Sequence, residues 1–272
     1  CAEVLGMEYD AIHIHAGDTA AAPLNTGAFA SRTLIAGAGA IREAAESLRG
    51  KILRIAAWVL ECEPEALDIS GDAVRFREGS NRSVPLADIF FRAIIGQGIP
   101  ESEAPGLEAS AHFEPTDASF SFGTAAAVVL VDPESGEFNV ERFIMAHDSG
   151  VPVNPLLVEG QVRGGLVQGL GAALAEDLQI DPGTGQLTSG SMLDYFAPTA
   201  ADVPPIELLH SEIPTPVTTF GVRGVGEVGT IPPGAAVANA LCDALADYGV
   251  ELSALPLTPE SVWRALEIAR GQ

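Results

Sequence analysis

The feature that most constrains this fold is a predicted helix crowded with glycine. Residues 155–176 follow Asn154–Pro155, a pair typical of a helix start, and have a helical pattern. The helix holds five glycines, at positions 160, 164, 165, 169 and 171. Each costs about 0.5–1 kcal/mol relative to alanine in a helix interior. The sequence therefore predicts that something large packs against this helix, either a ligand or, at Gly165 and Gly169, another helix.

Two glutamines in the same helix point to a shared face. Gln161 and Gln168 are seven residues apart, so they project from nearly the same side of the helix. Close helix packing does not account for two polar amides on that side. A ligand contact remains open for both, although for Gln168 we favour a packing role slightly.

A second glycine-rich stretch, GVRGVGEVGT at 221–230, contains a single acid, Glu227. Glycines permit φ > 0 turns and let a bulky ligand approach the backbone closely. We expect Thr230 to cap the following helix and Pro232 to lie in its first turn. A carboxylate on such a loop is either a catalytic or ligand-binding acid or an ordinary surface acid.

Charge and cysteine content exclude several classes of protein. With 37 acidic and 14 basic residues the formal charge is −23, which disfavours a nucleic-acid-binding surface. Genomic base composition or salt adaptation is the simplest explanation of the acidity. The three cysteines lie far apart, which excludes a four-cysteine iron–sulfur or zinc site and favours a reducing cytoplasm. No apolar run is long enough to cross a bilayer.

The patterns along 272 residues indicate two lobes, with a Pro/Glu-rich connection over 100–117 between them. The first lobe is 1–117, with a small-residue loop at 17–33; the second is 118–272, with the helix 155–176 and the loop 221–231. The opening residues read as a helix tail, which suggests a piece of a longer polypeptide. Periodicity predicts a strand at 11–17, hairpins at 66–78 and 119–150, and helices at 39–61, 85–95, 232–248 and 259–270.

The histidines carry a weaker signal. His13 and His15 alternate on the predicted strand, but no third ligand has a spacing that suits a metal. His147 and Asp148 end a strand, where they are more suited to orienting the next loop than to chemistry. We expect His210 in a solvated loop, and Trp58 and Trp263 in the core.

Four motifs in order resemble the molybdenum-binding subunit of the xanthine oxidase family, which includes aldehyde oxidoreductases, xanthine dehydrogenases and aerobic carbon monoxide dehydrogenases. They are GDTAAAPLNTGAFASRT (17–33), HDSGVPVNPLLVEGQVRGGLVQGLGAAL (147–174), GVRGVGEVGTIPPGAAVANAL (221–241) and ELSALPLTPESVWRAL (251–266). The resemblance implies an α+β fold that corresponds to the C-terminal half of that subunit.

The resemblance also implies site residues. Glu227 matches the family's active-site glutamate, and Gln161 matches a glutamine that hydrogen-bonds the molybdenum–pterin end of the cofactor. A cofactor-contacting loop matches Ala28, Phe29, Ala30, Ser31 and Arg32, while Gly226 and Gly229 shape the glutamate loop. The alternatives are a helix cap for Ser31 and a surface ion pair for Arg32. No protein-ligated metal is implied.

The implied activity is hydroxylation of an aldehyde or N-heterocycle with oxygen from water, Glu227 acting as general base for a molybdenum-bound hydroxyl. The implied cofactor is molybdenum–molybdopterin, as the cytosine dinucleotide. The implied partners are the N-terminal half of the subunit, a [2Fe–2S] subunit and an FAD subunit, in a dimer of heteromers. Carbon monoxide oxidation, or a non-catalytic cofactor-binding or scaffold module, are the alternatives.

Overall fold

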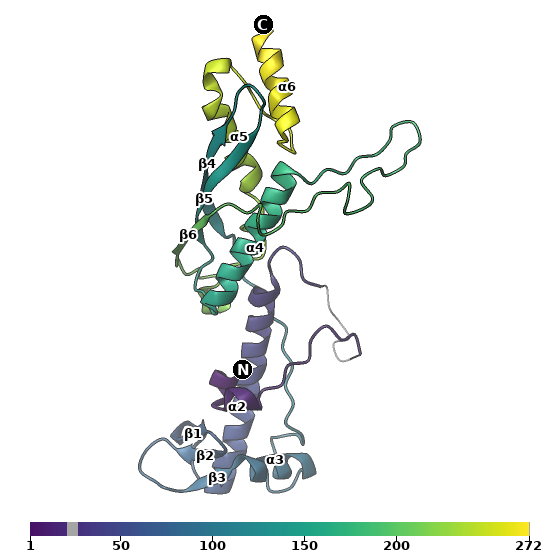
Figure 1. Cartoon of the computed structure of the whole chain (residues 1–272). Helices are drawn as coiled ribbons and strands as arrows, with labels where there is room; N and C mark the ends of the chain where they lie inside the picture. The colour runs from purple at the N-terminus through teal and green to yellow at the C-terminus, as the bar shows by residue number, and fades with distance from the viewer. Residues whose placement is uncertain (21–26, 272) are drawn as a thin grey trace. The chain divides into compact units, whose positions relative to one another are not determined.

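The structure is a computed structural model that describes residues 1–20 and 27–271. Residues 21–26, the middle of the expected 17–33 loop, lie outside the described residues. The chain divides into two compact units, one of residues 1–28 and 33–115 and one of residues 29–32 and 116–272 (Figure 1). The segment Phe29–Arg32 therefore groups with the second unit, whereas the whole 17–33 loop was expected in the first lobe.

The first unit packs one long helix against a small sheet. It contains α1 (Ala2–Leu5), α2 (Thr33–Leu60), β1 (Leu67–Ser70), β2 (Ala73–Phe76), β3 (Ser83–Pro85) and α3 (Leu86–Ile95), with short 3₁₀ turns at Tyr9–Ala11 and Pro64–Ala66. The three strands are antiparallel in the order β1-β2-β3. Ile55 of α2, Val74 of β2 and Ile89 of α3 are fully buried together in the core.

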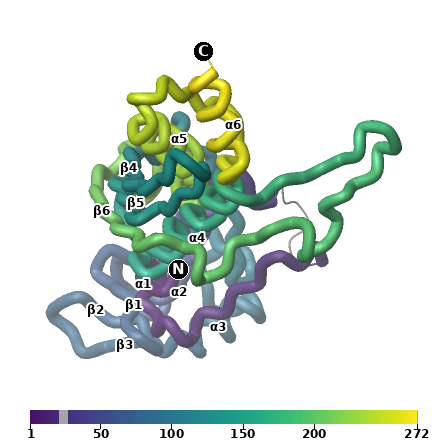
Figure 2. Tube along the Cα trace, turned by 45° about the horizontal axis from the view of Figure 1, so that its top comes forward, coloured from purple at the N-terminus to yellow at the C-terminus, as the bar shows by residue number. Residues whose placement is uncertain are grey.

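The second unit is built on a mixed sheet. Its elements are β4 (Phe122–Val131), β5 (Phe138–Asp148), α4 (Pro155–Leu174), β6 (Ile206–Ser211), α5 (Pro233–Ala244) and α6 (Pro259–Arg270), with 3₁₀ turns at Thr219–Gly221 and Ala246–Tyr248. β4 pairs antiparallel with β5, and β5 pairs parallel with β6. A parallel pair needs a long crossover, which α4 provides together with the extended loop 175–205 seen in Figures 1 and 2.

The core of this unit joins the sheet to the helices. Phe143 and Met145 of β5 are buried against Leu166 of α4, Leu241 of α5 and Leu266 of α6. Capping fixes two of these helices. Asn154 Oδ1 accepts a hydrogen bond from the Leu157 N–H at the start of α4, and Thr258 Oγ1 does the same for Ser261 at the start of α6.

Several sequence predictions are confirmed and others are wrong. The two hairpins, α3, α4 and α6 lie where periodicity placed them, and the α+β fold class is confirmed. Residues 12–16 form no strand, because no second strand pairs with them among the described residues. Trp58 and Trp263 are 58% and 41% exposed rather than core residues. Among the described residues, no helix combines the length and the apolar character that crossing a membrane requires.

Candidate functional site

The loop 221–230 holds Glu227 between two points of close packing. Between the 3₁₀ turn at Thr219–Gly221 and the start of α5 it contains no helix or strand. A Cβ added to Gly224 would lie 2.6 Å from the carbonyl oxygen of Ser31, and one added to Gly229 would lie 2.9 Å from the backbone nitrogen of Leu166 in α4. Of the four glycines in the loop, only Gly221 has a positive φ. The others are therefore explained by the close approach of neighbouring backbone and not by a left-handed turn.

Ser31 is the partner of Glu227. Its hydroxyl accepts a hydrogen bond from the Glu227 N–H at 3.0 Å and donates one to Glu227 Oε2 at 3.2 Å. Both residues belong to the second unit by their contacts, although 196 positions separate them in the chain. The Glu227 side chain is exposed, but these two hydrogen bonds orient its carboxylate toward Ser31.

The segment that carries Ser31 has an unusual backbone. Ala30 and Ser31 have φ values of 50° and 55°, in the left-handed region that costs an L-residue about 1–2 kcal/mol. Ala28, Phe29 and Ala30 are exposed, and the Arg32 guanidinium carbon lies 5.0 Å from the centre of the Phe29 ring. Strained residues of this kind gather at binding sites, where surrounding contacts maintain them.

Helix α4 presents two different faces. Its buried face packs on the Glu227 loop, because Gly165 lies against Gly229 and Gly169 lies against Thr230. Its exposed face carries Gln161 and Gln168. Gly160 and Gly164 share that exposed side by helical periodicity, and a Cβ on either would meet no atom within 4 Å.

Close packing thus accounts for Gly165 and Gly169, but the predicted helix partner is confirmed only for Gly169, which also meets Pro233 of α5, because Gly165 lies against the loop residues Gly229 and Thr230. It also covers Gly171, which lies against Pro198, but it does not cover Gly160 or Gly164. Gln168 is exposed in the described chain, so the slight preference for a packing role stays a prediction. Gln161 directly precedes Val162, whose carbonyl oxygen lies against Gly229.

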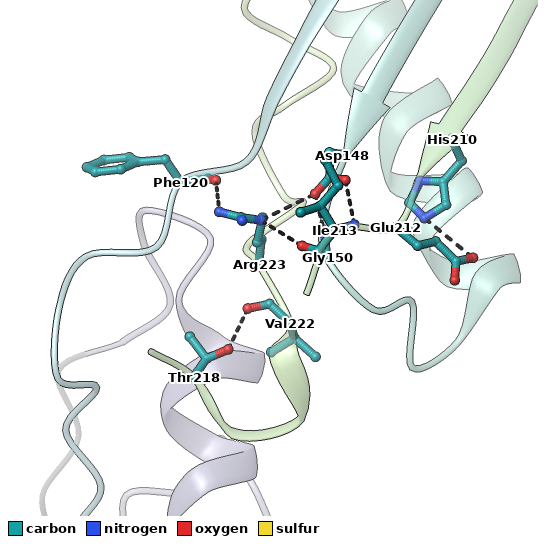
Figure 3. A network of polar contacts seen from close by, with 9 residues as sticks. All are labelled: Phe120, Asp148, Gly150, His210, Glu212, Ile213, Thr218, Val222 and Arg223. Carbon is teal, nitrogen blue, oxygen red and sulfur yellow. Dashed lines mark hydrogen bonds and ion pairs between the residues drawn. The ribbon is translucent and has the colours of Figure 1, made fainter. Parts of the chain in front are cut away.

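A buried ion pair lies at the other end of the Glu227 loop (Figure 3). Arg223 Nε is 3.2 Å from Asp148 Oδ1, and the two side chains are 16% and 1% exposed. Asp148 also accepts hydrogen bonds from the backbone N–H groups of Gly150 and Ile213. The suggestion that Asp148 orients the loop after β5 is thus confirmed. Sequence reasoning missed its pairing with Arg223, because no local pattern links two residues 75 positions apart.

Next to this pair lie two histidines. The His147 and His210 rings are 4.8 Å apart, on neighbouring strands β5 and β6. His210 is exposed as expected, but it lies on a strand and not in a loop. Burial lowers the pKa of His147, the nearby His210 lowers it further, and Asp148 opposes the shift. Across residues 1–20 and 27–271, no three His, Cys, Asp or Glu side chains come together in a way that could hold a metal ion, and this includes His13 and His15.

Thr230 does not cap α5 as predicted. The N-cap of α5 is Pro232, and Thr230 instead donates its N–H to the Glu227 carbonyl oxygen at 3.2 Å. That hydrogen bond closes a turn directly after the acid. The Glu227 loop is thus held by the ion pair before it, by Ser31 beside it and by α4 and the turn behind it.

Two parts of the second unit offer groups that suit a polar organic ligand: the exposed side of α4 and the segment of Ser31 and Arg32. The uncovered side of α4 at Gly160 and Gly164 leaves room for close backbone approach, and Gln161 on that side offers an amide. Ser31 and Arg32 offer a hydroxyl and a guanidinium, which suit an anionic phosphate group. The chemistry of this donor set matches what the motif resemblance implies.

Comparisons with known proteins identify the family of the chain. Residues 1–204 match the family described as Molybdopterin cofactor-binding domain. The chain is 37% identical to the nicotine 6-hydroxylase large subunit of Paenarthrobacter nicotinovorans, a match that covers 97% of the chain and 32% of that protein. It is 34% identical to the putative xanthine dehydrogenase molybdenum-binding subunit of Escherichia coli, over 98% of the chain and 35% of that protein.

Solved structures give the same answer. Quinoline 2-oxidoreductase from Pseudomonas putida 86 superposes with a TM-score of 0.85 at 35% identity, covering 98% of this chain and 34% of that one. CO dehydrogenase from Oligotropha carboxidovorans superposes with a TM-score of 0.86 at 28% identity, covering 99% and 33%. The chain belongs to the molybdopterin cofactor-binding domain family, and the resemblance to molybdenum-binding subunits of the xanthine oxidase family is confirmed.

The extent of these matches matters for the site. The family match includes Ser31 and Gln161 and ends before Glu227, whereas the pairwise matches span 97% of the chain or more. The chain spans about a third of the length of the relatives it matches.

Proposed function

We propose that this chain is the part of a molybdenum hydroxylase large subunit that supplies the general base, Glu227, for hydroxylation of an N-heterocycle or an aldehyde. The carrying observation is the pair of hydrogen bonds between Ser31 and Glu227, which joins two motifs 196 residues apart into one site. The names of two relatives, a nicotine hydroxylase and a quinoline oxidoreductase, favour an N-heterocycle as the substrate.

Each site residue has a separate task in this proposal. A molybdenum–pterin cofactor, when bound, supplies a Lewis-acidic centre that accepts the electrons of the substrate. Glu227 removes a proton from the water that provides the oxygen atom, a contribution typically worth 10²–10⁴ in rate. Ser31 aligns the Glu227 carboxylate through its hydroxyl, at an Oγ–Oε2 distance of 3.2 Å.

The remaining residues hold the cofactor. Gln161 hydrogen-bonds the pterin end, and Gly160 and Gly164 let it approach α4. Ala28 to Ser31 contribute backbone groups, and Arg32 pairs with the phosphate of the cofactor tail, which we take to be a cytosine dinucleotide. Gly226, whose added Cβ would lie 3.0 Å from Ser31 Oγ, and Gly229 keep the glutamate loop close to its supports.

The electrons must leave the site through other proteins. The three cysteines, all free thiols, are too few for an iron–sulfur cluster within this chain. We therefore propose a [2Fe–2S] subunit, an FAD subunit and the N-terminal half of the large subunit as partners, in a cytoplasmic dimer of heteromers. Free thiols suit that reducing compartment.

The test compares Glu227→Gln with Glu251→Gln, an exposed acid of the same unit, in the assembled enzyme. We expect Glu227→Gln to lose turnover by about 10²–10⁴ while molybdenum and pterin contents stay at wild-type levels. Glu251→Gln should match the wild type in both. Near-normal turnover of Glu227→Gln would refute the assignment.

The substrate panel separates the alternatives. The wild type should oxidise an N-heterocycle or an aldehyde faster than carbon monoxide, and the reverse order would assign it to carbon monoxide oxidation. A wild-type assembly that contains no molybdenum and oxidises none of the three would instead identify a scaffold module.

A further inference from the structure

The Asp148–Arg223 ion pair differs from the other ion pairs of the chain. Its side chains are 16% and 1% exposed, whereas in every other ion pair between described residues at least one side chain is 44% exposed or more. Exposed pairs contribute little because water and salt screen them, but a buried pair constrains geometry strongly. Arg223 lies four residues before Glu227, so the constraint acts on the loop that carries this acid.

Both partners are held by several segments (Figure 3). Asp148 Oδ1 accepts from the Gly150 N–H at 2.9 Å and Oδ2 from the Ile213 N–H at 2.8 Å. Arg223 donates from Nη1 to the Phe120 carbonyl oxygen at 2.8 Å, and its backbone N–H donates to the Ser149 carbonyl oxygen at 2.8 Å. Removing either side chain would leave a buried group without its partner.

Arg223 is connected to Glu227 through contacts and not through charge. Gly224 follows Arg223 and packs against Ser31, where an added Cβ would lie 2.6 Å from the carbonyl oxygen. Ser31 in turn hydrogen-bonds both the backbone N–H and the carboxylate of Glu227. A shift of Arg223 therefore moves Gly224 relative to Ser31, and with it the Glu227 carboxylate.

We propose that Asp148 and Arg223 are positioning residues that set where the Glu227 carboxylate lies, a role that rests on the proposed function of Glu227. Arg223 acts through its forked guanidinium, which reaches Asp148, Phe120 and Ile213 at once. A lysine keeps the charge beside Asp148 but offers a single ammonium in place of the fork. The charge is therefore less important here than the geometry.

The test uses Arg223→Lys in the assembled enzyme. The matched control is Arg142→Lys, which makes the same substitution in an exposed ion pair, with Glu207 on β6. We expect kcat of Arg223→Lys to fall about 10–100-fold, because misplacing a reacting group by about 1 Å costs about 10²-fold. KM and molybdenum content should stay unchanged, and Arg142→Lys should match the wild type.

A second readout does not need the loaded enzyme. The Glu227 N–H donates a hydrogen bond to Ser31 Oγ, which slows its exchange with solvent. In cofactor-free protein, this amide should exchange at least about tenfold faster in Arg223→Lys than in the wild type. Amides of β4 and β5 should exchange at wild-type rates. Unchanged kcat, unchanged exchange at Glu227, or faster exchange spread equally over β4 and β5 would each overturn the positioning role.

These outcomes are distinct from failure of the proposed function. If Glu227→Gln keeps its activity, Glu227 is not the base, whatever Arg223→Lys does. If Glu227→Gln is inactive while Arg223→Lys is fully active, the base assignment stands and the positioning role is wrong. Asp148→Asn turns one of the two acceptor oxygens into an NH2 group, which cannot accept the hydrogen bonds that Asp148 receives. It should therefore reproduce the faster exchange at Glu227.

Discussion

The packing of the Glu227 loop on α4 predicts that Gly229→Ala damages the site. The backbone of Gly229 is not in the left-handed region, so alanine is compatible with its φ. The new methyl group would overlap the Val162 carbonyl oxygen and lie 2.9 Å from the Leu166 nitrogen. Both are backbone atoms in a helix, which cannot rotate away as a flexible side chain would. The loop must therefore move off the helix.

Gly229→Ala should change both the free energy of unfolding and kcat. Overpacking a well-packed contact costs about 1–3 kcal/mol. Because the obstacle is backbone, we expect the upper half of that range, about 2–3 kcal/mol in the free energy of unfolding. Glu227 is two residues away and moves with the loop, so kcat should also fall about 10²-fold.

Gly164→Ala is the matched control for the effect on stability. This glycine lies on the exposed face of α4, where a Cβ meets no atom within 4 Å, so alanine should stabilise the helix by about 0.5–1 kcal/mol. Urea unfolding of the cofactor-free protein measures both variants. Equal stabilities for Gly229→Ala and Gly164→Ala would contradict the packing argument. Gly164→Ala should also lower molybdenum content, if the cofactor occupies the space beside it.

Two further predictions concern Ser31 and His147. Ser31→Ala and Ser31→Gly both remove the hydroxyl and should lower kcat about tenfold. Only glycine relieves the strain of the left-handed φ at this position. Urea unfolding should therefore show Ser31→Gly to be more stable than Ser31→Ala by about 1 kcal/mol. Equal free energies of unfolding for the two variants would argue against backbone strain at Ser31. Burial lowers the pKa of His147, so the unfolded chain takes up a proton near pH 6.5 while the folded chain does so only at lower pH. Stability should therefore fall as pH drops below about 6.5 and stay level above it. His147→Gln should flatten this dependence between pH 7.5 and 5.5, and the exposed His112→Gln should not.

Local patterns predicted the elements that depend on local interactions. The start of α4 follows from Asn154, whose side chain caps the helix, and the hairpin β4–β5 follows from two apolar runs around a short turn. The alternation at His13 and His15 misled, because a strand also needs a partner. β6 was missed for the opposite reason: the proline-punctuated stretch that contains it becomes a strand only by pairing with β5.

The site itself depended on long-range contacts, which sequence patterns do not reveal. The motif resemblance named Ser31 and Glu227 separately, and only the folded chain shows that one hydrogen-bonds the other. The Asp148–Arg223 pair had no sequence signal apart from an acid at a strand end and an arginine in a glycine-rich loop. Both contacts arise where the end of β5 and the Ser31 segment meet the same loop.

The glycines show how one helix serves two purposes. On the buried face of α4, Gly165 and Gly169 admit the Glu227 loop at backbone distance, which fixes the acid without any regular secondary structure around it. On the exposed face, Gly160 and Gly164 place no side chain next to Gln161. The destabilisation from glycine is thus offset on one face by protein packing. On the other face, nothing in the described chain offsets the destabilisation. A cofactor bound along α4 would supply the missing contacts there.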